Sequence, residues 1–170
     1  LILRMKLGVL PLFLLPYFQL LQAQEVVQYD TVLRFSPTLS FHFQRIQPGT
    51  FTMGSPPDEA MRGKDEGPQH EVTLLRGFYL GTYEVTQAEW EQVMGENPAV
   101  FQSLEKSSQH PVEYVSWNDC QEFISQLNEM GKGTFRLPTE AEWEYACRAG
   151  IQTAYYWGEM MAQNGSSDYA

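Results

Sequence analysis

The chain has 170 residues, a hydrophobic share of 43%, an aromatic share of 14% and a formal net charge of −10. The aromatic content favours an ordered globular domain over a disordered chain. The acidic balance argues against a general nucleic-acid binder, because contact with the phosphate backbone requires a basic face.

The first segment with a clear pattern is a candidate leader. Met5 and Lys6 precede an apolar run over residues 7–21, and Ala23 stands just after it. A basic start, a short apolar run and a small residue near the cleavage point are typical of a secretory signal peptide. The run is short for a bilayer span of about 20 residues, and two prolines interrupt it. We predict a signal peptide over residues 1–23, with a retained N-terminal anchor as the alternative.

The predicted leader implies a secreted, periplasmic or cell-surface protein. Its removal takes away Arg4 and Lys6 and changes the formal charge from −10 to −12. Such compartments are oxidising, which permits disulfides at Cys120 and Cys147. No other apolar run of spanning length follows, so we expect no membrane segment after cleavage.

Residues 24–40 are a lead-in segment with one expected strand near residues 26–32. Further strands are indicated by the alternation of apolar and polar residues. Pro48 and Gly49 form a turn signal, which predicts a β-hairpin between the strands on either side of it. The strands expected after the lead-in cover residues 41–46, 50–53, 71–74, 78–80 and 83–85.

Residues 55–69 are predicted to form a surface loop, because the segment is rich in proline, glycine and charge. Its carboxylates are those of Asp58, Glu59, Asp65 and Glu66. Carboxylate oxygens suit calcium, but this spacing matches no known calcium-binding loop. A solvated loop is therefore the favoured interpretation, with a hard-cation site as the alternative.

Three helices are predicted from one capping pattern, in which a Ser or Thr N-cap is followed three residues later by an acidic side chain. The pairs are Thr86 with Glu89, Ser116 with Asp119, and Thr139 with Glu142. Glycines are expected to end the helices; these are Gly95, Gly131 and Gly150.

Each predicted helix carries an apolar stripe at the i, i+3, i+4 spacing. In the second helix it contains Cys120 and Phe123, and in the third it contains Trp143 and Cys147. The tryptophans beside the three caps are expected to anchor the core; these are Trp90, Trp117 and Trp143.

Five blocks of this sequence, in order, resemble the formylglycine-generating enzyme (sulfatase-modifying factor) family. An aromatic-Trp-Gly at residues 156–158 follows them. Together they extend over most of the chain after the lead-in. The blocks are residues 49–55 (GTFTMGS), 66–72 (EGPQHEV), 78–90 (FYLGTYEVTQAEW), 111–119 (PVEYVSWND) and 135–150 (FRLPTEAEWEYACRAG).

The resemblance implies an α+β fold of the C-type-lectin-like sort, with much irregular structure. It also implies that residues 41–170 are the N-terminal half of the family domain, because the family's Gly-Asn-Val-Trp-Glu-Trp and Arg-Gly-Gly-Ser blocks are absent. In catalytic members two cysteines of the second half bind copper(I). Neither Cys120 nor Cys147 lies in a matching motif, and the family's calcium segments lie largely beyond Tyr169.

No catalytic, cofactor-binding or metal-binding residue is assigned within this sequence. His42, His70 and His110 have no metal-type spacing, and His42 is expected to be exposed on its strand. The resemblance implies a structural disulfide from Cys147 to a downstream cysteine, with a free thiol as the alternative. Cys120 is expected to be a buried thiol, and a bridge between these two cysteines stays open.

The family resemblance leaves three functions to compare. The first is an exported, copper-dependent oxidase that converts a sulfatase cysteine to formylglycine, with a sulfatase polypeptide as partner. The second is a non-catalytic module of the same fold that binds protein or glycan. The third, an iron-dependent sulfoxide synthase, is disfavoured because no helical domain precedes residue 41.

Overall fold

The computed structural model describes residues 2–6 and 30–154, which fall into two compact units. Unit 1 contains the described residues up to Gln47 together with Gly77–Pro138. Unit 2 contains Pro48–Arg76 and the described residues from Thr139 onward. Each unit has its own sheet, so each is described separately.

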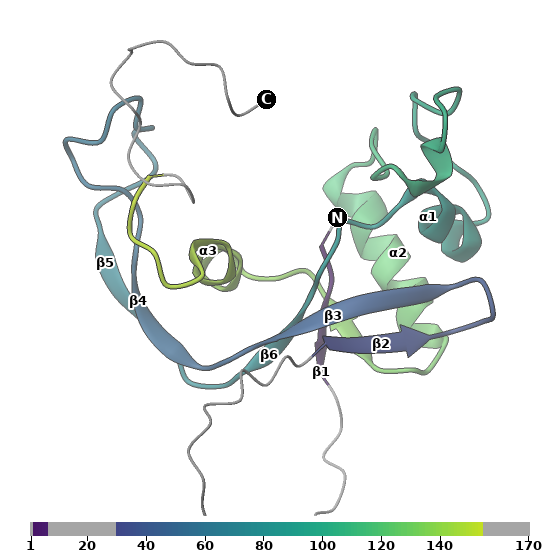
Figure 1. The fold of residues 1–170 in the computed structure, drawn as a ribbon, viewed down its shortest axis with the longest axis horizontal. Coiled ribbons are helices and arrows are strands. Elements are labelled where there is room, and N and C mark those ends of the chain that lie inside the picture. Colours follow the sequence, from purple (N-terminus) through teal and green to yellow (C-terminus); the bar gives the residue numbers. More distant parts are fainter. Residues whose placement is uncertain (1, 7–29, 155–170) are drawn as a thin grey trace, which may run out of the picture. The chain divides into compact units, whose positions relative to one another are not determined.

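Unit 1 is built on a five-stranded antiparallel sheet with the order β2-β3-β6-β1-β7. Figure 1 shows β2 and β3 as adjacent antiparallel arrows. The first strand of the chain lies inside the sheet, between strands that occur much later in the sequence. The strands are β1 (Arg4–Lys6), β2 (Asp30–Arg34), β3 (Ser40–Ile46), β6 (Phe78–Gly81) and β7 (Thr134–Arg136).

The core of unit 1 lies between one face of this sheet and the helices α1 (Gln87–Met94) and α2 (Trp117–Glu129). Phe41 and Phe43 point into it from β3, while His42 between them is exposed, as predicted. Trp90 of α1 stacks on Phe123 of α2, with ring centroids 4.9 Å apart and an interplanar angle of 10°. A short 3-10 helix, η1 (Ser107–Gln109), lies in the loop between α1 and α2.

Unit 2 pairs β4 (Gly49–Met53) with β5 (His70–Leu74) and packs α3 (Glu140–Arg148) against β4. The strand register runs from Gly49 opposite Leu74 to Met53 opposite His70. The rings of Phe51 and Tyr145 lie 5.3 Å apart. A Cβ at position 49 would collide with the Tyr145 hydroxyl, so glycine there permits the close approach of α3.

The three predicted capping boxes are confirmed. Thr86, Ser116 and Thr139 each accept a hydrogen bond from the N3 amide, and the N3 carboxylate accepts one from the N-cap amide. Gly95 adopts the left-handed conformation at the end of α1. At the end of α3 the C-cap is Ala149, which is left-handed, and the predicted Gly150 directly after it also has a positive φ, of 89°.

The predicted hairpin across Pro48 and Gly49 is wrong. The two strands flanking this turn belong to different sheets, since β3 pairs with β2 and β6 whereas β4 pairs with β5. Residues 83–85 also form no strand. The Val85 carbonyl instead accepts a hydrogen bond from Val112 at 2.9 Å, and Val85 is buried in the core. Local alternation specified strands but not their partners.

Only one of the three predicted tryptophan anchors is confirmed. Trp90 is 2% exposed, whereas Trp117 is 67% and Trp143 48% exposed. Trp117 begins its helix, whereas Trp143 has the same position after its N-cap as Trp90, so the capping pattern does not decide whether it is buried. Cys147, one turn further along α3, is also exposed. In α3 the buried residue is Glu142, the capping carboxylate.

The structure describes only the first few residues of the predicted leader. Residues 7–29, including the cleavage point after Ala23, lie outside the described residues, and the leader stays a prediction. Residues 4–6 form β1, and Leu3 and Met5 are buried in the core of unit 1. The lead-in contributes β2, which pairs with β3. No helix in the described ranges is long and apolar enough to cross a membrane.

Candidate functional site

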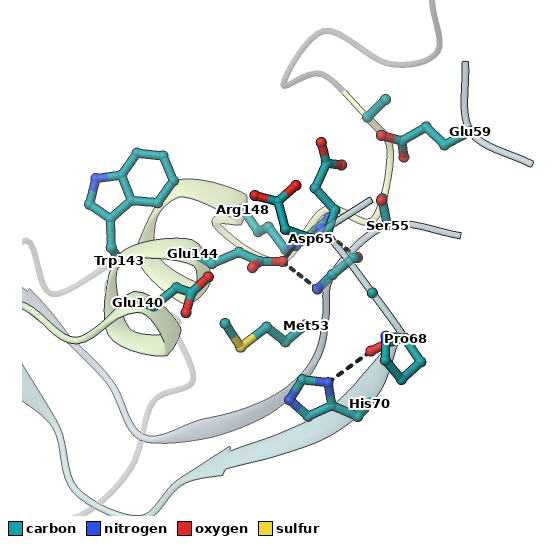
Figure 2. Close-up of a pocket in the computed structure, with 14 residues that line it drawn as sticks. Met53, Ser55, Glu59, Asp65, Pro68, His70, Glu140, Trp143, Glu144 and Arg148 are labelled. Carbon is teal, nitrogen blue, oxygen red and sulfur yellow. Dashed lines mark hydrogen bonds and ion pairs between the residues drawn. The ribbon is translucent and has the colours of Figure 1, made fainter. Parts of the chain in front are cut away.

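A cavity of about 430 Å³ opens in unit 2 between α3 and the loop that joins β4 to β5. Thr139 fixes the start of α3, which places Glu140, Trp143, Glu144 and Arg148 on the helix face that lines the cavity. Figure 2 shows Trp143 and Glu140 projecting from α3. The lining from the strands and loop is Met53, Gly54, Ser55, Glu59, Asp65, Glu66, Gly67, Pro68 and His70.

Three groups join the wall of this cavity. The Gly54 amide donates to Glu144 Oε1 at 2.9 Å, and Arg148 Nε donates to the same oxygen at 2.8 Å. Arg148 Nη2 donates to the Gly54 carbonyl at 3.0 Å. This closed set of contacts fixes the end of β4 to the middle of α3, since both polar groups of Gly54 are satisfied from the helix.

In the loop over residues 55–69, Asp58, Asp65 and Glu66 are exposed and Glu59 is half-buried, while hydrogen bonds within the loop hold its backbone. The Ser55 amide donates to the Glu66 carbonyl at 2.9 Å, and Arg62 Nε donates to Ser55 Oγ at 2.9 Å. The Gly63 amide donates to Glu66 Oε1 at 2.8 Å. The hydrogen bond from the Gly63 amide, and after it one from the Ser55 side chain, lower the pKa of Glu66. The predicted surface loop is confirmed.

The cavity is strongly acidic. Five carboxylates line it against the single guanidinium of Arg148 among the described residues. Within the described ranges, the side-chain carboxylates of Glu59, Asp65 and Glu140 have no hydrogen-bond or ion-pair partner. An excess of negative charge attracts a cationic group, and an exposed indole such as that of Trp143 supplies a face for it. The arrangement therefore suits the binding of a cationic group.

The cysteines and histidines of the sequence analysis lie away from this cavity, apart from His70. His70 Nδ1 is 3.0 Å from the Pro68 carbonyl. Burial raises the pKa of the half-buried Cys120 thiol, and Asp119 raises it further. Cys147 is exposed, and both cysteines are free. The disulfide expected at Cys147 stays a prediction.

Sequence reasoning missed this cavity, because its residues come from separate blocks. The i, i+4 spacing of Glu144 and Arg148 was one available signal, since such a pair lies on a single helix face. Nothing local indicated that Gly54 would complete the contact from 90 residues earlier. In the described part of the chain, no group of three or more His, Cys, Asp or Glu side chains is arranged to hold a metal ion.

Comparisons with known proteins place this chain among relatives of one family. The profile of the sulfatase-modifying factor enzyme 1-like domain matches residues 37–170. Mouse formylglycine-generating enzyme is 30% identical over 169 residues, covering 71% of this chain and 43% of its own length. Bovine inactive C-alpha-formylglycine-generating enzyme 2 is 38% identical over 97 residues, covering 56% of this chain and 29% of its own. The chain spans less than half the length of these relatives.

Solved structures show the same fold. PvdO from Pseudomonas aeruginosa superposes with a TM-score of 0.65 at 25% identity, covering 80% of this chain and 57% of its own. Treponema denticola variable protein 1 superposes with a TM-score of 0.62 at 22% identity, covering 76% and 60%. The expected α+β architecture is therefore confirmed.

Proposed function

Because the chain belongs to the sulfatase-modifying factor enzyme 1-like family, we propose that the whole protein converts a cysteine of a sulfatase polypeptide to Cα-formylglycine. The observation that carries the proposal is the profile match over residues 37–170 together with the similarity to the mouse enzyme. Export through the predicted leader, to a secreted, periplasmic or cell-surface location, forms part of the same proposal.

The proposed reaction replaces the side chain –CH2–SH by an aldehyde. Dioxygen is the oxidant and a thiol reductant supplies two electrons and two protons. The C–S bond breaks and a C=O bond forms, with hydrogen sulfide and water as the other products. This balance requires no further co-reactant.

Copper is proposed only for the whole protein, because the described residues do not fit it. Copper(I) selects soft thiolate ligands, and the cysteines among these residues are Cys120 and Cys147. Both cysteines are free, and the pKa of the Cys120 thiol is raised rather than lowered. Calcium likewise remains an expectation from the family resemblance.

Within this proposal the described residues supply scaffold and one wall of a binding surface. In unit 2, contacts among Glu144, Arg148 and Gly54 hold α3 against the end of β4. These contacts fix one wall of the acidic cavity, which Trp143 also lines. In this proposal the cavity positions a polypeptide substrate but supplies none of the oxidative chemistry.

A non-catalytic binding module is the second candidate. The observation that favours it is the acidic cavity with an exposed indole, which is suited to a cationic group on a protein or other ligand. The relative named as inactive shows that the family includes members without the activity.

One experiment separates the two candidates. The protein from the complete reading frame is loaded with copper(I) and incubated in air with a thiol reductant and a sulfatase cysteine-motif peptide. Aldehyde formation, detected with a hydrazide reagent, supports the enzyme, provided the cysteine-to-serine peptide gives none. An unchanged peptide and no bound copper(I) would leave the binding module as the function.

A further inference from the structure

Strand β1 occupies a position between two strands that are otherwise unconnected in the sheet. It pairs antiparallel with β6, with Met5 opposite Tyr79, and antiparallel with β7, with Met5 opposite Phe135. Figure 1 shows this short purple strand among elements of much later sequence. Without β1, the facing edges of β6 and β7 would each present unpaired amides and carbonyls, which is the state that accepts an added strand.

The position is shaped for two apolar side chains. Leu3 is 2% and Met5 1% exposed, and both belong to the core cluster that includes Phe43 and Phe135. Because alternate residues of a strand share a face, an occupant needs apolar residues two positions apart. Burial of both side chains removes apolar surface from water, which stabilises a bound strand.

Two glycines make room for this occupant. The Gly81 amide donates to the Leu3 carbonyl at 2.6 Å, and a Cβ at position 81 would lie 3.2 Å from the Leu3 amide nitrogen. A Cβ at position 133 would lie 3.3 Å from Cγ of Met5. A side chain at either position would press on β1, so both glycines permit its close approach.

The residue between the two apolar positions is also recognised. The Arg4 guanidinium carbon lies 5.1 Å from the centre of the Phe78 ring, within the range of a cation–π contact. Phe78 is 3% exposed, so this contact is formed on a desolvated surface. The position between β6 and β7 therefore distinguishes an apolar-cationic-apolar sequence from a merely apolar one.

We propose that the space between β6 and β7 is a binding site for an extended peptide with apolar side chains two residues apart and a cation between them, and that residues 2–6 occupy it in cis. Recognition is by strand addition, in which backbone hydrogen bonds give affinity and the alternate side chains give specificity. We call this position the strand-acceptor site.

The site connects to the predicted leader. Residues 2–6 lie within the segment that cleavage after Ala23 would remove, so processing would empty the strand-acceptor site. A peptide segment with the same pattern would then be able to take the place of β1. On this proposal, cleavage at the predicted position would remove the occupant and open the strand-acceptor site.

A nick-and-exchange experiment tests peptide binding in the full chain. A site-specific protease site is introduced within residues 10–20, and the folded protein is cut. We expect the N-terminal fragment to stay bound during gel filtration and to exchange with a labelled peptide of residues 1–8. The Met5→Asp peptide should bind at least tenfold more weakly, because it buries a charge, and Arg4→Ala should also weaken binding. Loss of the fragment on cutting, or equal binding of all three peptides, would overturn the proposal.

A disulfide trap tests the register and the in cis assignment. Lys6 lies directly opposite Thr134, so Lys6→Cys with Thr134→Cys should cross-link in one chain when Cys120 and Cys147 are replaced by serine. The matched control pairs Lys6→Cys with Arg136→Cys, which is offset by two residues. Equal yields in the two pairs, or cross-links mainly between chains, would contradict occupancy by the chain's own residues.

Discussion

Glu144 and Arg148 form an ion pair one turn apart on α3, with Nε and Oε1 separated by 2.8 Å, and both are also bonded to Gly54. The pair is about one-fifth exposed at each side chain. The contact with Gly54 is the important one, because it joins a local pair on the helix to the end of β4, which is distant in sequence. The acidic cavity depends on this connection.

Replacement of Glu144 by Gln should destabilise the chain by about 1 kcal/mol. The substitution removes the charge that accepts from Gly54 and Arg148, and partial exposure reduces the loss. Chemical denaturation measures the change. Glu140→Gln is the control, since Glu140 lines the same cavity with no partner among the described residues; a control loss as large as that of Glu144→Gln would contradict the connection.

Alanine substitutions of Trp90 and Trp117 should have very different effects on the free energy of unfolding. Trp90→Ala should cost about 3–5 kcal/mol, because the ring is 2% exposed and stacked on Phe123. Trp117→Ala should change the free energy of unfolding by about 0.5 kcal/mol or less, because its side chain is 67% exposed. Equal losses in denaturant titrations would contradict the core described for unit 1.

Ala149→Gly should stabilise the chain by about 1 kcal/mol. Ala149 has a φ of 48°, a left-handed conformation that is costly for a residue with a Cβ and free of that cost for glycine. The matched control is Ala146→Gly, which lies within α3 and should destabilise by about 1 kcal/mol. Thermal unfolding of both variants checks the opposite signs.

The Asp119 carboxylate should report on the cap of α2 through its titration. Hydrogen bonds from the Ser116 hydroxyl and then the Ser116 amide lower the pKa of Asp119 below its ordinary 3.8. A lowered folded-state pKa means that the stabilisation is present above the unfolded value and is lost as pH falls through the folded one. Ser116→Ala should raise the pKa of Asp119, measured by NMR titration; an unchanged value would rule out the hydroxyl as the cause.

The two thiols should react at different rates. Cys147 is exposed and should react with a thiol reagent well before Cys120, whose pKa is raised by burial and which therefore has less thiolate at a given pH. Single serine variants assign the two phases. In the whole protein, Cys147 that reacts only after reduction would support the predicted disulfide, whereas immediate reaction would establish a free thiol.

Local sequence determined the helices and their starts. Each capping box joins residues three positions apart, so Thr86, Ser116 and Thr139 mark the starts of their helices from local sequence alone. The alternation in residues 41–46 likewise specified which side chains of β3 are buried. The ordered blocks of the sequence identified the family.

Only the tertiary structure decided which elements meet. Strand pairing is set by contacts between distant segments, so alternation did not reveal that β4 pairs with β5 or that β1 lies between β6 and β7. The exposure of Trp143 depended on which face of α3 packs on β4, and Gly54 completed the cavity wall from far along the chain. A capping box forms between residues three positions apart, whereas side-chain burial and strand pairing depend on contacts with segments that are distant in sequence.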